Sequence, residues 1–189
     1  MTKYPALFLD RDGVINIDKG YVHNKENCEF INGIFDLVKR ANQHSYKVVV
    51  VTNQAGIARG FYTEEQFLGF SEWMKNEFSN HQAFIDKIYF CPHHPVYGQG
   101  IYHVSCNCRK PAPGMFQQAQ EEFDIDMSKS IMVGNNLSDI EAACAVDVKH
   151  RYLFIESKEK HILESDQAQE DPLLFRAITS LDQVNFLSA

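Results

Sequence analysis

Short apolar runs alternate along this chain with segments whose apolar residues have helical spacing, and this order limits the possible folds most. The runs cover residues 6–9, 48–51, 88–90, 131–133 and 152–155. Helical spacing occurs between them at Ile34, Leu37, Val38 and Ala41, and then at Phe67, Phe70, Met74 and Phe78. Such alternation predicts a parallel sheet with helices on both faces, so we expect an α/β three-layer sandwich with a central parallel sheet.

Local signals refine the ends of these segments. Thr63 precedes Gln66 by three residues and Ser138 precedes Glu141 by three, the spacing of a capping box, so we predict helix starts at both places. The interval 156–171 is dense in charge and poor in apolar residues, which predicts a mobile loop. A short amphipathic helix is predicted after it from three spaced apolar residues, Leu174, Ile178 and Leu181.

Length and charge exclude several classes of protein. The 189 residues fit one domain, residues 1–189, and the net charge of -7 argues against general nucleic-acid or anionic-membrane binding. No apolar run approaches the roughly 18 residues of a membrane span, and residues 1–5 lack the pattern of a signal peptide. We therefore expect a cytoplasmic monomer with a small-molecule substrate and neither a nucleic-acid nor a membrane partner.

Two carboxylates, Asp10 and Asp12, directly follow the first apolar run. In open parallel sheets ligands bind beyond the carboxyl ends of the strands. Two acids this close disfavour joint ionisation unless a cation lies between them, so we expect a divalent metal ion there. The alternative is a turn in which either residue only caps a loop.

The end of the second run is also polar. Thr52, Asn53 and Gln54 stand there, and Gly56 follows. A hydroxyl and backbone N–H groups at a strand end can donate hydrogen bonds to phosphate oxygens, although a polar turn has the same composition. Further along, Lys110 lies at the start of a helical stretch, where a cation is suited to bind phosphate. A solvated pair of basic residues, with Arg109, is the alternative.

Four soft ligands form two close pairs in the sequence. Cys91 and His93 precede an interval that ends at Cys106 and Cys108. Thiolate and imidazole groups in this number suit a tetrahedral structural Zn²⁺, which would stiffen the loop rather than catalyse. Because the five cysteines are an odd number, a disulfide framework is not expected, and reduced thiols beside unrelated histidines are the alternative.

Taken together, these segments resemble the four motifs of the haloacid dehalogenase superfamily. The segments that carry the resemblance are 8–16, 51–54, 106–111 and 133–139. Within the superfamily the chain resembles the D-glycero-D-manno-heptose 1,7-bisphosphate phosphatase family, followed by the histidinol-phosphate phosphatases, over about residues 4–155. The long interval between His93 and Cys106 favours the heptose family.

The resemblance implies a Rossmann-like fold and a reaction through an aspartyl-phosphate. Asp10 would be the nucleophile and Asp12 the general acid and base. Thr52 and Lys110 would hold the phosphoryl group, while Mg²⁺ would be bound by Asp10, the Asp12 carbonyl and Asn135. The implied substrate-binding residues are Asp18, Tyr21, Asn53, Gln54, Arg109 and Asn136.

Two residues depart from the family pattern. Asn135 stands where the family has Asp, and Asn136 where the heptose enzymes tend to have a basic residue. An amide oxygen can ligate Mg²⁺ but lacks the charge of a carboxylate, so we expect weakened Mg²⁺ binding. The interval from Asp12 to Thr52 leaves no room for a large cap domain, which favours hydrolysis of a bulky phosphorylated sugar.

Two other functions stay open at this point. One is a phosphatase for histidinol phosphate or another small phosphomonoester. The other is a catalytically weak or silent relative that binds a phosphorylated ligand or a partner protein, as Asn135 would permit.

Overall fold

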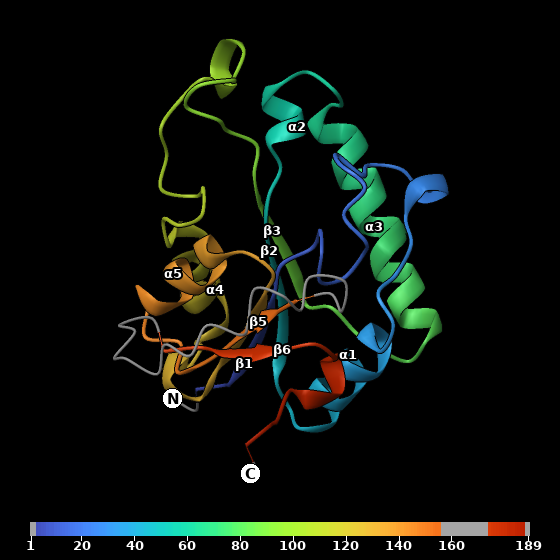
Figure 1. The fold of residues 1–189 in the computed structure, drawn as a ribbon, viewed down its shortest axis with the longest axis vertical. Helices are drawn as coiled ribbons and strands as arrows, with labels where there is room; N and C mark the ends of the chain where they lie inside the picture. The colour runs from blue at the N-terminus through green and yellow to red at the C-terminus, as the bar shows by residue number, and fades with distance from the viewer. Residues whose placement is uncertain (1–2, 156–173, 188–189) are drawn as a thin grey trace.

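A parallel sheet between two layers of helices makes up the computed structural model, which describes residues 3–155 and 174–187 (Figure 1). The strand order is β3-β2-β1-β4-β5-β6. The strands are β1 (Ala6–Leu9), β2 (Lys47–Asn53), β3 (Lys87–Cys91), β4 (Ile131–Gly134), β5 (His150–Phe154) and β6 (Arg176–Ile178). The helices are α1 (Ile34–Gln43), α2 (Ala55–Ala58), α3 (Glu64–Asn80), α4 (Gly114–Phe123) and α5 (Leu137–Cys144). Short 3-10 helices are η1 (Lys25–Asn27), η2 (Gly100–Tyr102), η3 (Met127–Lys129) and η5 (Leu181–Gln183).

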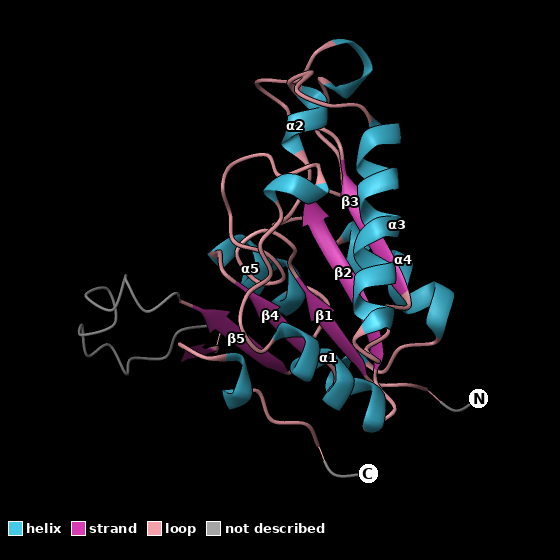
Figure 2. Ribbon diagram, turned by 90° about the vertical axis from the view of Figure 1, so that its right-hand side faces the viewer, coloured by secondary structure: helices cyan, strands magenta, loops and turns pink. Residues whose placement is uncertain are grey.

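The apolar runs form strands because both of their faces are covered. Successive side chains of a strand point to opposite faces, so Leu7 and Leu9 join the core beneath α1 and α3. Ala6 and Phe8 join the second core, beneath α4 and α5. Figure 2 shows the two helix layers on either side of the sheet. The predicted three-layer α/β fold is therefore confirmed.

Strand β1 lies at the point where the chain changes direction across the sheet. Its residue Leu9 is paired in register with Val50 of β2 on one side and Val133 of β4 on the other. The loops that follow these three strands therefore meet at one edge of the sheet, where α/β proteins bind ligands. Within the described residues only η1 and α1 stand between β1 and β2, so no cap domain covers that edge there.

The capping prediction is right at Thr63 and wrong at Ser138. Thr63 Oγ1 accepts from the Gln66 N–H at 3.1 Å, and Gln66 Oε1 accepts from the Thr63 N–H at 2.9 Å. Helix α5 begins two residues earlier than predicted, at Leu137, because its N-cap is Asn136 and not Ser138. The reason is Asp139, whose carboxylate accepts the Asn136 N–H at 3.0 Å and completes a box with Asn136.

The predicted C-terminal helix is also wrong. Ile178 lies in β6 and is paired with Phe154 on the open edge of β5, whereas Leu181 begins η5. Pairing with an exposed strand edge has therefore overridden the helical spacing of three residues. The predicted mobile loop at 156–171 lies outside the described residues. In the part of the chain that is described, none of the helices has the length and apolar character of a membrane crossing.

Candidate active site

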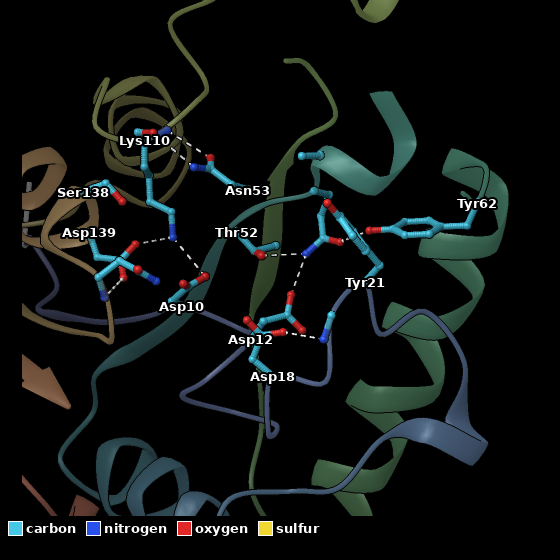
Figure 3. Close-up of a pocket in the computed structure, with 14 residues that line it drawn as sticks. Asp10, Asp12, Asp18, Tyr21, Thr52, Asn53, Tyr62, Lys110, Ser138 and Asp139 are labelled. Atoms are coloured by element: carbon cyan, nitrogen blue, oxygen red, sulfur yellow. Dashed lines mark hydrogen bonds and ion pairs between the residues drawn. The ribbon is translucent and has the colours of Figure 1, made fainter. Parts of the chain in front are cut away.

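A cavity of about 380 Å³ opens beyond the carboxyl ends of β1 and β2. It brings together most of the predicted site residues: Asp10, Asp12, Asp18, Tyr21, Thr52, Asn53, Gln54, Lys110 and Asn136. It is also lined by residues that the sequence did not single out for a role in the site, among them Tyr62 and Ser138. Figure 3 shows labelled members of this set, among them Asp10, Thr52 and Lys110, lying close together around one space.

Lys110 lies at the base of the cavity between two acids. Its Nζ is 3.0 Å from Asp10 Oδ1 and 2.7 Å from Asp139 Oδ1, and it donates to the Val51 carbonyl at 2.7 Å (Figure 3). Burial alone would lower the pKa of Lys110, but the two carboxylates outweigh burial and the pKa is raised. The lysine is therefore a fixed positive charge beside Asp10.

Asp10 is in the opposite electrostatic situation. Burial, followed by the nearby Asp139 carboxylate, raises the pKa of Asp10 to about 7, although Lys110 acts to lower it. One lysine thus balances only part of the negative charge at this place. A further cation beside Asp10 would favour its ionised form, as expected for a metal site.

Two contacts fix the loop that carries Lys110. Asn53 Oδ1 accepts from the Lys110 N–H at 3.0 Å, and its Nδ2 donates to the Lys110 carbonyl at 3.1 Å. The structure therefore uses the Asn53 side chain to hold Lys110 in place. Gly134 makes room for Asp139, the other acid beside Lys110. A Cβ at position 134 would lie 2.3 Å from Asp139 Cβ, so only glycine fits there.

Asp12 is surrounded by hydrogen-bond donors. Arg11 bonds both of its oxygens, Asn16 donates to Oδ1 at 3.0 Å, and Gln54 donates to Oδ2 at 3.2 Å. Gln54 also donates to Thr52 Oγ1 at 2.8 Å and accepts from the Tyr62 hydroxyl at 2.5 Å. Burial raises the pKa of Tyr62 to about 12, so this hydroxyl remains a donor.

The other predicted residues lie at the edges of the site. Asp18 and Tyr21 line the cavity mouth and are exposed. Arg109 is not among the lining residues, and its Nη1 donates to the His93 carbonyl at 3.3 Å. Asn135 lines a neighbouring cavity together with Gly13 and Asp18.

The oxygen donors at the strand ends are of the types that Mg²⁺ prefers. Asp10 and Asn135 follow the neighbouring strands β1 and β4, and the Asp12 carbonyl belongs to the same loop as Asp10. Gly13 has φ +85°, and a Cβ there would lie 2.0 Å from Asn135 Nδ2, so Asn135 packs directly against this first loop. Carboxylate, carbonyl and amide oxygens are the ligands that Mg²⁺ takes.

The four predicted zinc ligands meet in one cluster. The ligand atoms of Cys91, His93, Cys106 and Cys108 all lie within 4.8 Å of one another. The three cysteine Sγ atoms are 2.8 to 3.4 Å apart, and a tetrahedral Zn²⁺ with Zn–S bonds of about 2.3 Å would hold them about 3.8 Å apart, so the site needs only a small expansion to take the ion. The loop that they anchor reaches α2, where the Gln99 N–H donates to the Ala58 carbonyl at 2.9 Å (Figure 1).

The fold and the acids at the end of β1 define a phosphatase of the haloacid dehalogenase type, a phosphoric monoester hydrolase. Residues 8–169 match the family described as polynucleotide kinase 3 phosphatase. A crystal structure of a HAD-like phosphatase from Mesorhizobium loti is similar with a TM-score of 0.82, at 28% identity over 95% of this chain and 82% of that one. The D,D-heptose 1,7-bisphosphate phosphatase of B. bronchiseptica, crystallised with magnesium and phosphate, has a TM-score of 0.77 at 28% identity over 94% and 93% of the two chains.

Curated proteins narrow the family further. The chain is 48% identical over 149 residues, 79% of each chain, to the D-glycero-beta-D-manno-heptose-1,7-bisphosphate 7-phosphatase of Yersinia pestis. It is 51% identical over 146 residues, 77% of each chain, to the corresponding enzyme for the alpha anomer in Burkholderia mallei. The chain therefore belongs to the heptose bisphosphate phosphatase family.

Proposed function

We propose that this chain removes the 7-phosphate of D-glycero-D-manno-heptose 1,7-bisphosphate through an aspartyl-phosphate on Asp10. The observation that carries the proposal is the Asp10 carboxylate, which lies at the base of the cavity with Lys110 beside it at 3.0 Å. The identity to heptose bisphosphate 7-phosphatases supports the choice of sugar. Relatives named for either anomer are similarly close, so the assay below includes both.

The reaction has two displacements at phosphorus. In the first, an oxygen of Asp10 forms a bond to phosphorus while the bond to the sugar oxygen breaks, and Asp12 gives that oxygen its proton. In the second, Asp12 takes a proton from water, the water oxygen bonds to phosphorus, and the bond to Asp10 breaks. Inorganic phosphate leaves, and both acids return to their starting forms.

The transferring phosphoryl group is held by Thr52 and Lys110. Because Thr52 Oγ1 accepts the Gln54 N–H, its own proton can be donated to a phosphate oxygen. Lys110 supplies positive charge from a buried position, where electrostatic stabilisation of the transition state is strongest. Asp18, Tyr21 and Asn136 would contact the sugar or its distal phosphate at the cavity mouth.

Two metal ions complete the proposal. Asp10, the Asp12 carbonyl and Asn135 would hold Mg²⁺, which would neutralise charge on the phosphoryl oxygens. Cys91, His93, Cys106 and Cys108 would hold a structural Zn²⁺ that stiffens the loop beside the cavity. Reduced thiols and a phosphorylated sugar substrate favour the cytoplasm, where we propose that the chain acts as a monomer.

The test is a substrate panel assayed by release of inorganic phosphate in the presence of Mg²⁺. Both anomers of the heptose bisphosphate, histidinol phosphate and an aryl phosphate are compared. We expect the highest kcat/KM for one heptose anomer, and a loss of about 10³-fold or more in Asp10→Asn but not in Asp182→Asn, an exposed acid outside the site. Preference for histidinol phosphate, or full activity of Asp10→Asn, would overturn the proposal.

A further inference from the structure

Arg11 stands between the two acids in the sequence and has no part in the reaction described above. It is nevertheless the largest fully buried side chain of the described residues, with 1% of its surface exposed. We propose that Arg11 is a positioning residue that fixes the orientation of the Asp12 carboxylate, and through it the proton transfer to the leaving oxygen. This inference rests on the proposed role of Asp12.

Arg11 and Asp12 form a bidentate ion pair. Nε of Arg11 lies 3.1 Å from Asp12 Oδ2, and Nη2 lies 3.0 Å from Oδ1 and 2.8 Å from Oδ2. Such a planar fork defines the plane of the carboxylate as well as its distance. The remaining donors, Asn16 and Gln54, each give one neutral hydrogen bond and would permit Asp12 to turn.

The guanidinium group is itself held from several sides. Nη2 also donates to the Val22 carbonyl at 2.6 Å, which ties Arg11 to the loop that carries Tyr21. The group lies 5.5 Å from the Phe67 ring centre and 5.3 Å from that of Phe70, both on α3. Arg11 therefore connects Asp12 to a rigid helix rather than to solvent.

The cations of the site are divided between its acids. Lys110 is paired with Asp10 and Asp139, while Arg11 is paired with Asp12. The nucleophile and the proton donor thus have separate partners, and a change at Arg11 leaves the Asp10 pair in place. This separation permits a test of Arg11 through the step that Asp12 performs.

Leaving groups distinguish that step from general damage. A sugar alkoxide needs a proton as it departs, whereas a 4-nitrophenolate ion departs without one. Loss of Asp12 orientation should therefore lower kcat/KM for a sugar phosphate much more than kcat/KM for 4-nitrophenyl phosphate. The comparison uses kcat/KM because it is set by formation of the aspartyl-phosphate, whereas kcat also includes the hydrolysis step that both substrates share. A defect in folding or in phosphate binding would lower both equally.

The experiment compares Arg11→Met and Arg11→Lys with Arg40→Met as the matched control. Arg40 also bonds backbone carbonyls, those of Leu181 and Val184, where Arg11 bonds one, and it lies 5.5 Å from the centre of a phenyl ring, but it is outside the site. For Arg11→Met we expect kcat/KM to fall about 100-fold with the sugar phosphate and less than about 5-fold with 4-nitrophenyl phosphate. Arg11→Lys should recover part of the selective loss, and Arg40→Met should show none.

Equal losses with both substrates, or no loss, in the Arg11 variants would overturn the inference. If Arg11→Met does not fold, Arg11→Lys alone decides, since a selective loss there supports positioning and an unselective one contradicts it. Asp12→Asn separates the role proposed for Asp12 from the role proposed for Arg11. Should it lack the selective loss, the proposed role of Asp12 fails, whereas a selective loss in Asp12→Asn without one in Arg11→Lys refutes only the role of Arg11.

Discussion

The effect of Gly56→Ala on the free energy of unfolding should change sign depending on which residue is present at position 62. Gly56 lies in α2, and a Cβ there would be 2.2 Å from Cε1 of Tyr62 and 2.7 Å from its hydroxyl oxygen. The ring cannot move away easily, because it is 4% exposed, stacks on His23 at 4.6 Å and donates to Gln54 at 2.5 Å. Alanine at 56 must therefore displace a packed side chain.

Two opposing free energies set the magnitude. Forcing a methyl group into a packed site costs about 1–3 kcal/mol, while alanine in place of glycine in a helix contributes roughly 0.5–1 kcal/mol of stability. We expect Gly56→Ala to lower the free energy of unfolding by about 1–2 kcal/mol. In a Tyr62→Ala background the obstacle is absent, and the same change should raise it by up to about 1 kcal/mol.

The assay is urea unfolding of the native chain, the two single variants and the double variant. The coupling free energy between the two positions should be roughly 2–3 kcal/mol, with similar m-values for all four proteins. Gly56→Ala should also lower kcat several-fold, because a shifted Tyr62 releases Gln54 from its contacts with Thr52 and Asp12. An equal cost of Gly56→Ala in both backgrounds would refute the steric argument.

Three further predictions concern charge and metal. Asn135→Asp should bind Mg²⁺ roughly tenfold more tightly in calorimetric titration, since a carboxylate carries a charge that an amide lacks, and an unchanged affinity would contradict the assignment of this ligand. Burial raises the pKa of Asp10 to about 7, so the stability that its proton gives the metal-free fold is complete below pH 4 and is lost as pH rises through 7. In urea unfolding, the free energy of unfolding of Asp10→Asn relative to that of the native chain should therefore increase over this range by on the order of 4 kcal/mol. A difference that does not change with pH would show that Asp10 titrates normally. Purified chain should contain one equivalent of zinc, and chelation should lower Tm by several degrees and expose residues 92–105 to protease; a content below about half an equivalent, with no effect of chelation, would rule out the cluster.

The sequence predicted the sheet and the main acids because both depend on local pattern. A strand buried on both faces has to be apolar throughout, and the residues directly after it occupy the binding edge of the sheet. Asp10, Asp12 and Thr52 were located by that rule alone. The zinc cluster was predicted for a similar reason, since Cys91 and Cys108 belong to short pairs whose residue types are unusual together.

Residues whose roles depend on distant contacts were not predictable in this way. Tyr62 lines the cavity because Gly56 leaves room for its ring and Gln54 accepts a hydrogen bond from its hydroxyl group. Neither contact has a sequence signature. Asn53 lines the cavity as predicted, and its amide also bonds the Lys110 backbone, a contact that no sequence pattern indicates. Ile178 had helical spacing and became a strand residue, because the neighbour that decides is β5.

We expect a second consequence of the asparagine at 135, in addition to the weaker Mg²⁺ binding predicted above. Around the reacting phosphorus the acids Asp10, Asp12 and Asp139 are paired with two cations, Lys110 and Arg11. A bound Mg²⁺ would add two positive charges to this site, whereas an aspartate at 135 would offset one of them. Since attraction of an anion follows the local charge, the amide favours binding of the phosphate dianion at the expense of the metal. Asn135→Asp should therefore bind Mg²⁺ more tightly and inorganic phosphate more weakly, and parallel strengthening of both would contradict this charge balance.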